Sequence, residues 1–410
     1  MHYIERDIEA LVAETASEYP AILVTGPRQV GKTTMLEHLI AQQERPFEKV
    51  SLDDLSLRSL AVNDPAMFFQ MHKPPVFIDE VQYAPGLFVE MKKMIDSGAK
   101  PGSFWLTGSQ QFRLMELSGE SLAGRIAILP LSSLSQHELH GKGTGTPLSL
   151  HLESLQERAN LFAPADVGAM FARMRKGAMP AVNAGARSNL AVFYGSYVQT
   201  YIERDVRRLL GNVDVLAFSA FMTSAAARCS QMLNVQSIAD DVGERPEKVK
   251  TWLGVLEKSG VIFYLHPYSN NQLKRTVKAP KLYFHDCGLV AHLTKWTSAE
   301  TMEAGAMAGA FMENYVVSEI RKGYANAGLE APLYYYRDRD AREIDLVLES
   351  DGKLHPIEIK KTASPNMSMT RNFKALDKAT VPQGAGAVVC MSENLGALNA
   401  ETFIVPVWML

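Results

Sequence analysis

The segment GPRQVGKTT, residues 26–34, has the residue types and the spacing that hold a chain of phosphate groups. Gly26, Gly31, Lys32 and Thr33 fill the pattern G-x-x-x-x-G-K-[ST]. The glycines let backbone N–H groups curl around phosphate oxygens, Lys32 would neutralise the β- and γ-phosphates, and the Thr33 hydroxyl would reach Mg²⁺. A chance match of so short a pattern is the alternative. We expect MgATP to be bound by the whole loop: Gly26, Pro27, Arg28, Gln29, Val30, Gly31, Lys32, Thr33 and Thr34.

A pair of carboxylates follows the next apolar segment. Residues 76–78 read as a buried strand, and Asp79 and Glu80 come directly after it. An acid in this place beside a phosphate loop binds Mg²⁺, which is the role we expect for Asp79, and Glu80 would orient or deprotonate the attacking water. The alternative is a plain acidic end of a strand.

Two later segments offer further catalytic candidates. The apolar segment 104–108 ends in Ser109 and Gln110, either of which could place the lytic water near the γ-phosphate, although a simple exit from strand to turn explains them almost as well. Arg125 precedes another apolar segment, where it could reach a neighbouring subunit's site and stabilise charge on the transferred phosphoryl group. A surface arginine is an equally weighted interpretation.

A second set of chemically suited residues lies near the end of the chain. Asp345 falls within one expected strand, and Glu358 and Lys360 fall on the next. Because side chains alternate along a strand, Glu358 and Lys360 project to one face and Lys361 to the other. Two carboxylates with a lysine suit a Mg²⁺-dependent phosphodiesterase, with the acids on the metal and the lysine near the attacking water. An ion pair at the edge of a sheet is the alternative.

The elements that position these residues change in character along the chain. Residues 21–25 read as a strand before the phosphate loop, and 35–43 read as an amphipathic helix after it. Residues 141–148 read as a loop, and 233–268 read as two helices and a hairpin in the order of a winged helix-turn-helix. From about residue 300 the order is helix, three strands, a polar helix around 367–378, and a strand.

The expected winged helix carries charges of both signs. Its basic residues could bind phosphates, but acidic residues beside them weaken the field, so nucleic-acid contact and a purely structural role are close alternatives. The basic residues are Lys248, Lys250, Lys258, Lys274, Arg275, Lys278 and Lys281, and the acidic ones are Glu244, Glu247 and Glu257.

The bulk composition sets limits on these interpretations. A chain of 410 residues is long enough for two to four domains, and 42 basic against 45 acidic residues give no overall attraction to nucleic acid. There is no signal-peptide pattern and no apolar run long enough to span a membrane. The three cysteines, Cys229, Cys287 and Cys390, lack metal-ligand spacing and are expected to be buried thiols. We expect a cytoplasmic protein that does not enter a membrane.

The order GPRQVGKTT, IDEVQYAP, LTGSQ, SLAGRI resembles the AAA+ superfamily, and in particular one branch of prokaryotic AAA-type ATPases of largely uncharacterised role. This resemblance covers nearly the whole chain. It implies a RecA-like αβα core, a helical lid and often a homo-oligomer. In that family a helix with two tyrosines followed by an Arg-Asp pair also occurs, here Tyr197, Tyr201, Arg204 and Asp205. Arg204 could contact nucleotide from the lid, but an Arg–Asp packing network is the favoured interpretation.

The acidic and lysine residues of the last third resemble the PD-(D/E)xK nuclease superfamily. In that superfamily an acid from the first helix often completes the metal site, which implies Glu313 beside Asp345 and Glu358, with Glu319 in reserve. Six residues separate Glu313 from Glu319, so the two face different ways on a helix.

The fold class we expect is α/β with several domains. Residues 1–132 would form the AAA+ P-loop core, 133–212 the helical lid and linker, 213–282 a winged helix and 283–410 a nuclease-like α/β domain. The expected function is Mg²⁺-dependent ATP hydrolysis coupled to DNA binding or processing. The alternative is a nucleotide-dependent binding or signalling scaffold whose last domain docks a partner without cleaving anything.

Overall fold

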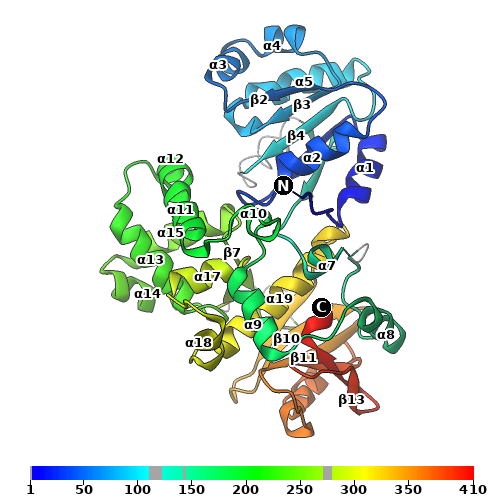
Figure 1. Cartoon of the computed structure of the whole chain (residues 1–410), viewed down its shortest axis with the longest axis vertical. Helices are drawn as coiled ribbons and strands as arrows, with labels where there is room; N and C mark the ends of the chain where they lie inside the picture. Colours follow the sequence, from blue (N-terminus) through cyan, green and yellow to red (C-terminus); the bar gives the residue numbers. More distant parts are fainter. Residues whose placement is uncertain (1, 110–121, 142–144, 271–278) are drawn as a thin grey trace.

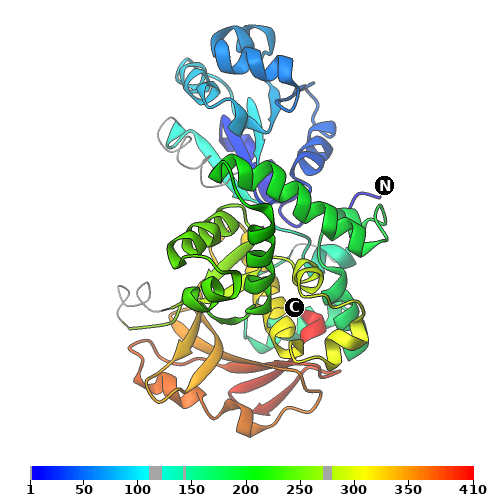
Figure 2. The same ribbon diagram turned by 90° about the vertical axis from the view of Figure 1, so that its left-hand side faces the viewer.

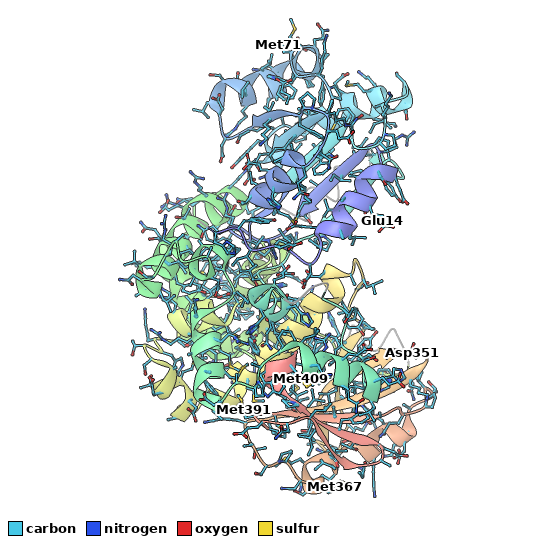
Figure 3. The ribbon with its side chains drawn as sticks, turned by 45° about the vertical axis from the view of Figure 1, so that its right-hand side comes forward. Glu14, Met71, Asp351, Met367, Met391 and Met409 are labelled. Carbon is cyan, nitrogen blue, oxygen red and sulfur yellow. The ribbon has the colours of Figure 1, made fainter. Side chains whose placement is uncertain are left out.

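The computed structural model describes residues 2–109, 122–141, 145–270 and 279–410. It is elongated, with one parallel sheet at one end, a mainly antiparallel part at the other and helices between them (Figure 1). Met71 and Met367 mark the two ends of the long axis (Figure 3). Both the N-terminal segment and the C-terminal residues reach the middle of the molecule (Figures 1 and 2).

The first sheet is parallel and has the order β2-β3-β4-β1-β5. Its strands are β1 (Ala21–Thr25), β2 (Glu48–Ser51), β3 (Val76–Asp79), β4 (Phe104–Gly108) and β5 (Ile126–Pro130). The central strands β1 and β4 are buried along their full length, as a sheet covered on both faces requires. The expectation of an α/β fold with a parallel sheet core is confirmed.

Helices cover both faces of this sheet. Alternate strand residues divide into two cores, with Ile22 and Val24 packing against one and Ala21 and Leu23 against the other. The helices are α1 (Glu9–Glu18), α2 (Lys32–Ala41), α3 (Leu55–Asn63), α4 (Pro65–Met71) and α5 (Gly86–Asp96), with a 3₁₀ turn η1 (Val81–Tyr83).

The helices expected as a lid are divided between two places. Those near the nucleotide-binding part are α10 (Pro180–Asn183), α11 (Leu190–Tyr201), the π-helical turn η2 (Ile202–Val206) and α12 (Arg207–Leu210). The others, α7 (Gln136–His140), α8 (Leu152–Leu161) and α9 (Val167–Lys176), lie farther down the molecule (Figure 1). There α8 contacts the C-terminal turn η5 (Val407–Met409), and α9 contacts α17 (Cys287–Leu293), α18 (Ala299–Ala304) and α19 (Ala308–Asn326).

Three helices and a small antiparallel sheet follow α12. In chain order they are α13 (Val215–Ala227), β6 (Gln231–Met232), α14 (Val235–Val242), α15 (Pro246–Lys258), β7 (Ile262–Leu265) and β8 (Lys281–Phe284), and the sheet order is β6-β8-β7. The start of α15 is set by Pro246 at a first-turn position, and Gly243 ends α14 in the left-handed conformation.

The last part is a six-stranded sheet in the order β13-β14-β12-β11-β10-β9. Its strands are β9 (Leu333–Arg337), β10 (Glu343–Ser350), β11 (Lys353–Lys360), β12 (Gly386–Cys390), β13 (Gly396–Asn399) and β14 (Thr402–Pro406). The polar helix expected around 367–378 is wrong in type, because this stretch forms two 3₁₀ segments, η3 (Met367–Thr370) and η4 (Phe373–Lys378). The cysteines are free and buried, as expected.

Within the described ranges, no single helix is long and apolar enough to cross a membrane. One bent pair, Leu190–Leu210 and Val215–Ala227 at 106°, meets the length and composition requirements together.

Candidate functional site

The phosphate loop runs from the end of β1 to the start of α2. Gly26, Gln29 and Gly31 all have positive φ, at 144°, 62° and 94°, which gives the tight curl of such a loop. A Cβ on Gly26 would lie 2.1 Å from the backbone oxygen of Leu131, so no larger residue fits there. Val30 is buried in the core between helices and sheet, and it anchors the outer side of the loop.

Lys32 is almost fully buried under the loop. Its Nζ donates to the backbone oxygens of Gly26 at 3.0 Å and Pro27 at 2.7 Å. Burial lowers the pKa of Lys32 to about 8, although Glu80 and Asp79 oppose the shift. A cation held inside the loop with only carbonyl partners is suited to meet an anion that replaces them.

Thr33 and Asp79 come together as expected. The Thr33 hydroxyl donates to Asp79 Oδ1 at 2.8 Å, and the Thr107 hydroxyl donates to the same oxygen. A hydroxyl beside a carboxylate supplies the hard oxygen ligands that Mg²⁺ prefers, with substrate phosphates and water completing its shell. The residues therefore fit Mg²⁺, which would be held between Thr33 and Asp79.

Glu80 directly follows the carboxyl end of β3, beside the phosphate loop. Its backbone is left-handed, with φ 57°, and its N–H donates to the Thr107 hydroxyl at 3.2 Å. Its Oε2 accepts a hydrogen bond from the Gln82 amide and another from the Ser109 hydroxyl, the latter at 3.3 Å. Ser109, one of the two expected water-positioning candidates, thus holds Glu80. The other, Gln110, lies outside the described residues.

A cavity of about 930 Å³ opens over the loop. Residues Arg28–Thr34 and Glu80 line one side of it, and the N-terminal residues His2–Ile4, the stretch 186–189 and the face of α11 line the other. Tyr3 is fixed there by stacking on His38 with ring centroids 4.1 Å apart. Gly26 and Pro27, also expected to bind phosphate, instead line a separate cleft of about 620 Å³ behind the loop.

Two arginines hold the loop, one from outside the expected site and one from within it. Arg6 is buried and donates to the backbone oxygen of Val30 at 2.8 Å, while it pairs with Glu138 of α7 at 2.9 Å. Arg28, within the loop, forms an ion pair with Asp205 in the π-helical turn η2. Burial lowers the pKa of Arg28, but the carboxylates of Asp205 and Glu80 outweigh it and hold the pKa above its ordinary value.

The expected Arg204–Asp205 packing network is wrong in its partner. Arg204 is exposed, and Asp205 pairs with the loop residue Arg28 instead. Tyr197 and Tyr201 are buried in the helical core, as their spacing indicated.

Arg125 lies at the edge of the sheet opposite the phosphate loop. The register pairs Ala21 with Ile126 and Thr25 with Pro130, so Arg125 precedes the amino end of β5 while the loop follows the carboxyl end of β1. Its guanidinium pairs with Asp96 at 2.6 Å, and both side chains are partly exposed. This placement favours the surface interpretation and supplies no charge to the loop of the same chain.

In the last sheet, Asp345 and Glu358 converge on one lysine. Lys360 Nζ lies 2.8 Å from Asp345 and 2.6 Å from Glu358. Burial and the Asp345 carboxylate raise the pKa of Glu358 to about 8. Lys361 points the other way, toward Glu303, as the alternation along β11 requires.

Glu313 does not join these two acids directly. Lys281 pairs with Glu313 at 3.0 Å and with Glu343 at 2.7 Å, and the Tyr283 hydroxyl donates to Glu313. The expectation that Lys281 belongs to an exposed basic face is wrong, because its side chain is 4% exposed inside this cluster. The reserve residue Glu319 faces α7 and accepts hydrogen bonds from the Gln136 N–H and from Lys322.

The expected three-carboxylate metal centre of Glu313, Asp345 and Glu358 is not formed. Within the part of the chain that the structure describes, no group of three or more His, Cys, Asp and Glu side chains has the arrangement to hold a metal ion. The physical reason is that lysine ammonium groups stand where the carboxylates would otherwise share a cation.

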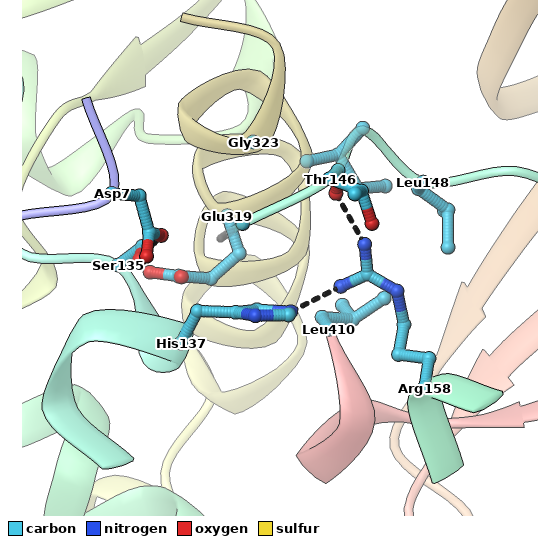
Figure 4. Close-up of a pocket in the computed structure, with 11 residues that line it drawn as sticks. Asp7, Ser135, His137, Thr146, Leu148, Arg158, Glu319, Gly323 and Leu410 are labelled. Carbon is cyan, nitrogen blue, oxygen red and sulfur yellow. Dashed lines mark hydrogen bonds between the residues drawn. The ribbon is translucent and has the colours of Figure 1, made fainter. Parts of the chain in front are cut away.

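A small cavity lies at the junction of α7, α8 and α19 (Figure 4). Its volume of about 10 Å³ is at most that of one water molecule. Arg158 crosses it, donating to His137 Nε2 at 2.7 Å and to the backbone oxygen of Thr146. Burial and the Arg158 charge lower the pKa of His137 to about 4. This is a structural joint with no room for a ligand.

Sequence reasoning missed three residues that shape the nucleotide site. Thr107 and Gln82 hold the two carboxylates, and Arg6 holds the loop. A signal existed for Thr107, which ends the strand beside the one carrying Asp79. Arg6 carries no local signal, since its partners are 24 and 132 positions away.

Residues 18–140 match a family model described as an AAA domain. With the strand order and the loop geometry, this match defines the class of this part of the chain as an AAA-type P-loop domain. Two further models, both described as domains of unknown function, match residues 169–300 and 308–410.

Over 374 residues the chain is 27% identical to an uncharacterized protein of Mycobacterium tuberculosis, and that alignment covers 91% of this chain and 77% of the relative. An uncharacterized protein of Mycobacterium bovis matches with the same values. Among solved structures, a Walker-type ATPase of Pyrococcus abyssi is similar with 16% identity and a TM-score of 0.46, over 71% of this chain and 96% of that one.

Proposed function

We propose that the chain binds MgATP in the cavity over the phosphate loop and hydrolyses it. The observation that carries this proposal is the joining of Thr33, Asp79 and Thr107 beside a buried Lys32, with Glu80 at the edge of the same cavity. This is the set of groups that phosphoryl transfer to water requires: a cation on the phosphates, ligands for Mg²⁺ and an acid to orient the water.

The far side of the cavity is the proposed place of the adenosine. The phosphates occupy only the loop side, and the opposite wall is built from His2–Ile4 and from the stretch 186–189 before α11. Because these walls come from the N-terminal segment and from the helical part, nucleotide binding would join the two.

Two substitutions separate binding from hydrolysis. Lys32→Ala should weaken MgATP binding, since it removes the buried cation that faces the phosphates. Glu80→Gln should bind MgATP normally but hydrolyse it at least about a hundredfold more slowly, because the amide cannot accept the water's proton. Isothermal titration and phosphate release measure the two effects, and normal turnover by Glu80→Gln would remove that role from Glu80.

A second candidate function is metal-dependent DNA cleavage by the last domain. It is favoured by the convergence of Asp345, Glu358 and Lys360 on adjacent strands. A divalent cation would have to displace Lys360 from the two acids. In this proposal residues 213–282 act as a winged helix that brings DNA to the chain, with Lys250 exposed on α15 and Lys248 partly neutralised by Glu244 at 2.6 Å.

A plasmid assay decides between cleavage and a docking role. Wild-type protein, Glu358→Ala and Lys360→Ala would be incubated with supercoiled plasmid and Mg²⁺ or Mn²⁺. Nicking by wild type alone supports a nuclease, and identical nicking by all three indicates contamination. Without nicking under any condition, the closed ion-paired cluster is better explained as part of a scaffold.

Self-assembly is also part of the proposal, since AAA-type domains commonly work as rings. Light scattering with and without MgATP would detect a homo-oligomer. If assembly occurs, mixing Arg125→Ala with Glu80→Gln protein tests whether Arg125 acts across subunits, because restored turnover requires a composite site.

A further inference from the structure

The continuous helical stretch Leu190–Leu210 contacts the nucleotide site in two ways. Its first part lines the cavity, and a residue farther along forms an ion pair with the phosphate loop. From its π-helical turn η2, Asp205 reaches Arg28 of the phosphate loop. The two side chains are only 7% and 18% exposed, so this ion pair is formed largely out of water. Arg28 also lines the cavity over the loop, together with Lys32 and Glu80.

The same helical stretch also contacts the turn η1, which follows Glu80. The Arg208 guanidinium lies over the ring of Tyr83, 4.3 Å from its centroid, and Arg58 lies 3.9 Å from the same centroid. Tyr83 belongs to η1, the turn that directly follows Glu80. The helix is therefore joined to both halves of the site, the phosphate loop through Asp205 and the hydrolytic acid through Arg208.

The position of Asp205 in the helix is itself unusual. The turn Ile202–Val206 is π-helical between two α-helical segments, and π turns are rare and concentrated at functional sites. The π-helical turn interrupts the regular α-helical hydrogen bonding at the very residues that reach the phosphate loop.

We propose that Asp205 and Arg28 form a latch that the γ-phosphate of ATP opens, so that this pair lets the chain distinguish ATP from ADP. The inference rests on the proposed binding of MgATP in this cavity. Without a γ-phosphate, Asp205 neutralises Arg28; with one, the phosphate competes for the guanidinium, which binds phosphate oxygens in a bidentate manner.

The charges around the latch favour this exchange. Asp205 and Glu80 act on both Arg28 and Lys32, and Asp79 acts on Lys32. A triphosphate is therefore attracted to the two cations and repels the carboxylate of Asp205. Moving Arg28 onto the phosphate leaves the buried Asp205 uncompensated. A buried charge without its partner is costly, so Asp205 is expected to move away and to carry η2 and α12 with it.

Two substitutions test the latch by comparing nucleotides rather than by activity. Arg28→Gln should weaken a non-hydrolysable ATP analogue by about tenfold and change ADP affinity by less than about twofold. Asp205→Asn keeps the size of the side chain but removes its charge, so it should tighten the analogue relative to ADP by about tenfold. Arg28→Lys should recover part of the discrimination.

A matched control lies in the same turn. Glu203 pairs with Arg207 at 2.5 Å on the exposed side of the helix, and neither lines the cavity. Glu203→Gln should leave the affinity ratio of analogue to ADP unchanged. Equal loss of both nucleotides in Arg28→Gln and Asp205→Asn would indicate a merely structural pair and would overturn the inference.

Hydrogen exchange gives a second, independent readout. In the wild type, the analogue but not ADP should increase exchange in residues 200–210, and in Asp205→Asn this segment should exchange fast without nucleotide. Absence of any nucleotide binding by the wild type would instead contradict the proposed function. Binding with no change in 200–210 and no change in the affinity ratio contradicts only the latch.

Discussion

At the scale of single residues, Asp79, the proposed Mg²⁺ ligand, is held by a neighbour that lies outside the phosphate loop. Asp79 Oδ1 accepts hydrogen bonds from Thr33 and Thr107, and the Thr107 hydroxyl also accepts from the Glu80 N–H. Thr107 therefore fixes both acids at once. Groups that orient a metal ligand commonly change metal affinity or activity by 10–100-fold when removed.

Thr107→Val should retain the fold, because valine has nearly the same shape, but it should lower the rate of ATP hydrolysis by about tenfold or more. The loss should be partly relieved by raising Mg²⁺, since the hydroxyl positions its ligand. Steady-state kinetics against Mg²⁺ concentration measure this, with Thr107→Ser as the conservative control. A valine variant with unchanged Mg²⁺ dependence would show that Asp79 is held adequately without Thr107.

Asp7 gives the molecule a pH-dependent stability. Burial, followed by the charge of Glu138, raises the pKa of Asp7 to about 6 from its ordinary 3.8, against hydrogen bonds from Ser135 and Asn326. A pKa raised on folding means that the stabilisation is complete below about pH 4 and is lost as the pH rises through about 6.

Asp7→Asn should therefore reduce the fall in unfolding free energy between pH 4 and pH 7. The expected reduction is roughly 1–2 kcal/mol, after allowance for solvent screening of a partly exposed group. Urea unfolding at several pH values measures it. The exposed Asp351 offers a control, and Asp351→Asn should keep the wild-type pH profile.

At the scale of elements, the turn after α15 packs closely against the phosphate loop. Gly260 has φ 68°, and a Cβ placed on it would lie 2.7 Å from Pro27 Cγ. The loop is thus limited on its back side by the turn between α15 and β7. A substitution in this turn should change nucleotide affinity, although the turn lines only the cleft behind the loop.

Gly260→Ala should weaken nucleotide binding by about tenfold, because the added methyl group pushes Pro27 and with it the loop. Gly243→Ala is the matched control: its φ is 67°, and a Cβ there meets nothing within 4 Å. Both variants pay the same backbone cost, of about 1 kcal/mol, for a left-handed alanine. Equal nucleotide affinities in the two variants would show that the contact with Pro27 does not matter.

Elements whose signals are local could be predicted from the sequence. Each of these signals depends on a few adjacent residues. They are the strand before Gly26, the strand before Asp79 and the alternation of Glu358, Lys360 and Lys361. The 3₁₀ turns at 367–378 were mistaken for a helix because their polar composition fits either. The sequence could not show that α7–α9 pack in a different part of the molecule from α10–α12, since the apolar face of a helix does not indicate which surface it covers.

At the scale of the whole molecule, the joint around Arg158 connects parts distant in sequence. Arg158 of α8 bonds His137 of α7 and the Thr146 carbonyl, close to α19 and the C-terminal Leu410 (Figure 4). Because His137 is buried, removing the guanidinium leaves its imidazole without this hydrogen bond, and the partly buried bond to the Thr146 carbonyl is lost as well.

Arg158→Met should lower the unfolding free energy by about 1–3 kcal/mol, since the methionine fills the space but satisfies neither partner. Arg125→Met, which removes an exposed ion pair, should change it by less than about 0.5 kcal/mol. Denaturant unfolding followed by fluorescence measures both. Similar values for the two would mean that water replaces the lost bonds.

The long-range pairs were beyond sequence reasoning for a physical reason. Arg28 and Asp205 are 177 positions apart, and Lys281 reaches Glu313 and Glu343 across two strands and a helix. Each residue alone looks like an ordinary surface charge. Only the packing that brings them together removes them from water and makes them partners.

The phosphate loop is contacted by four residues that lie outside the segment matching the AAA domain: Arg6, Pro180, Asp205 and Gly260. The nucleotide-binding part of the chain therefore cannot be exchanged between relatives as an independent domain. Transplanting residues 18–140 into a relative would bring the motif but leave behind the side chains that hold its shape, so working chimaeras should require exchanging those outside partners as a set.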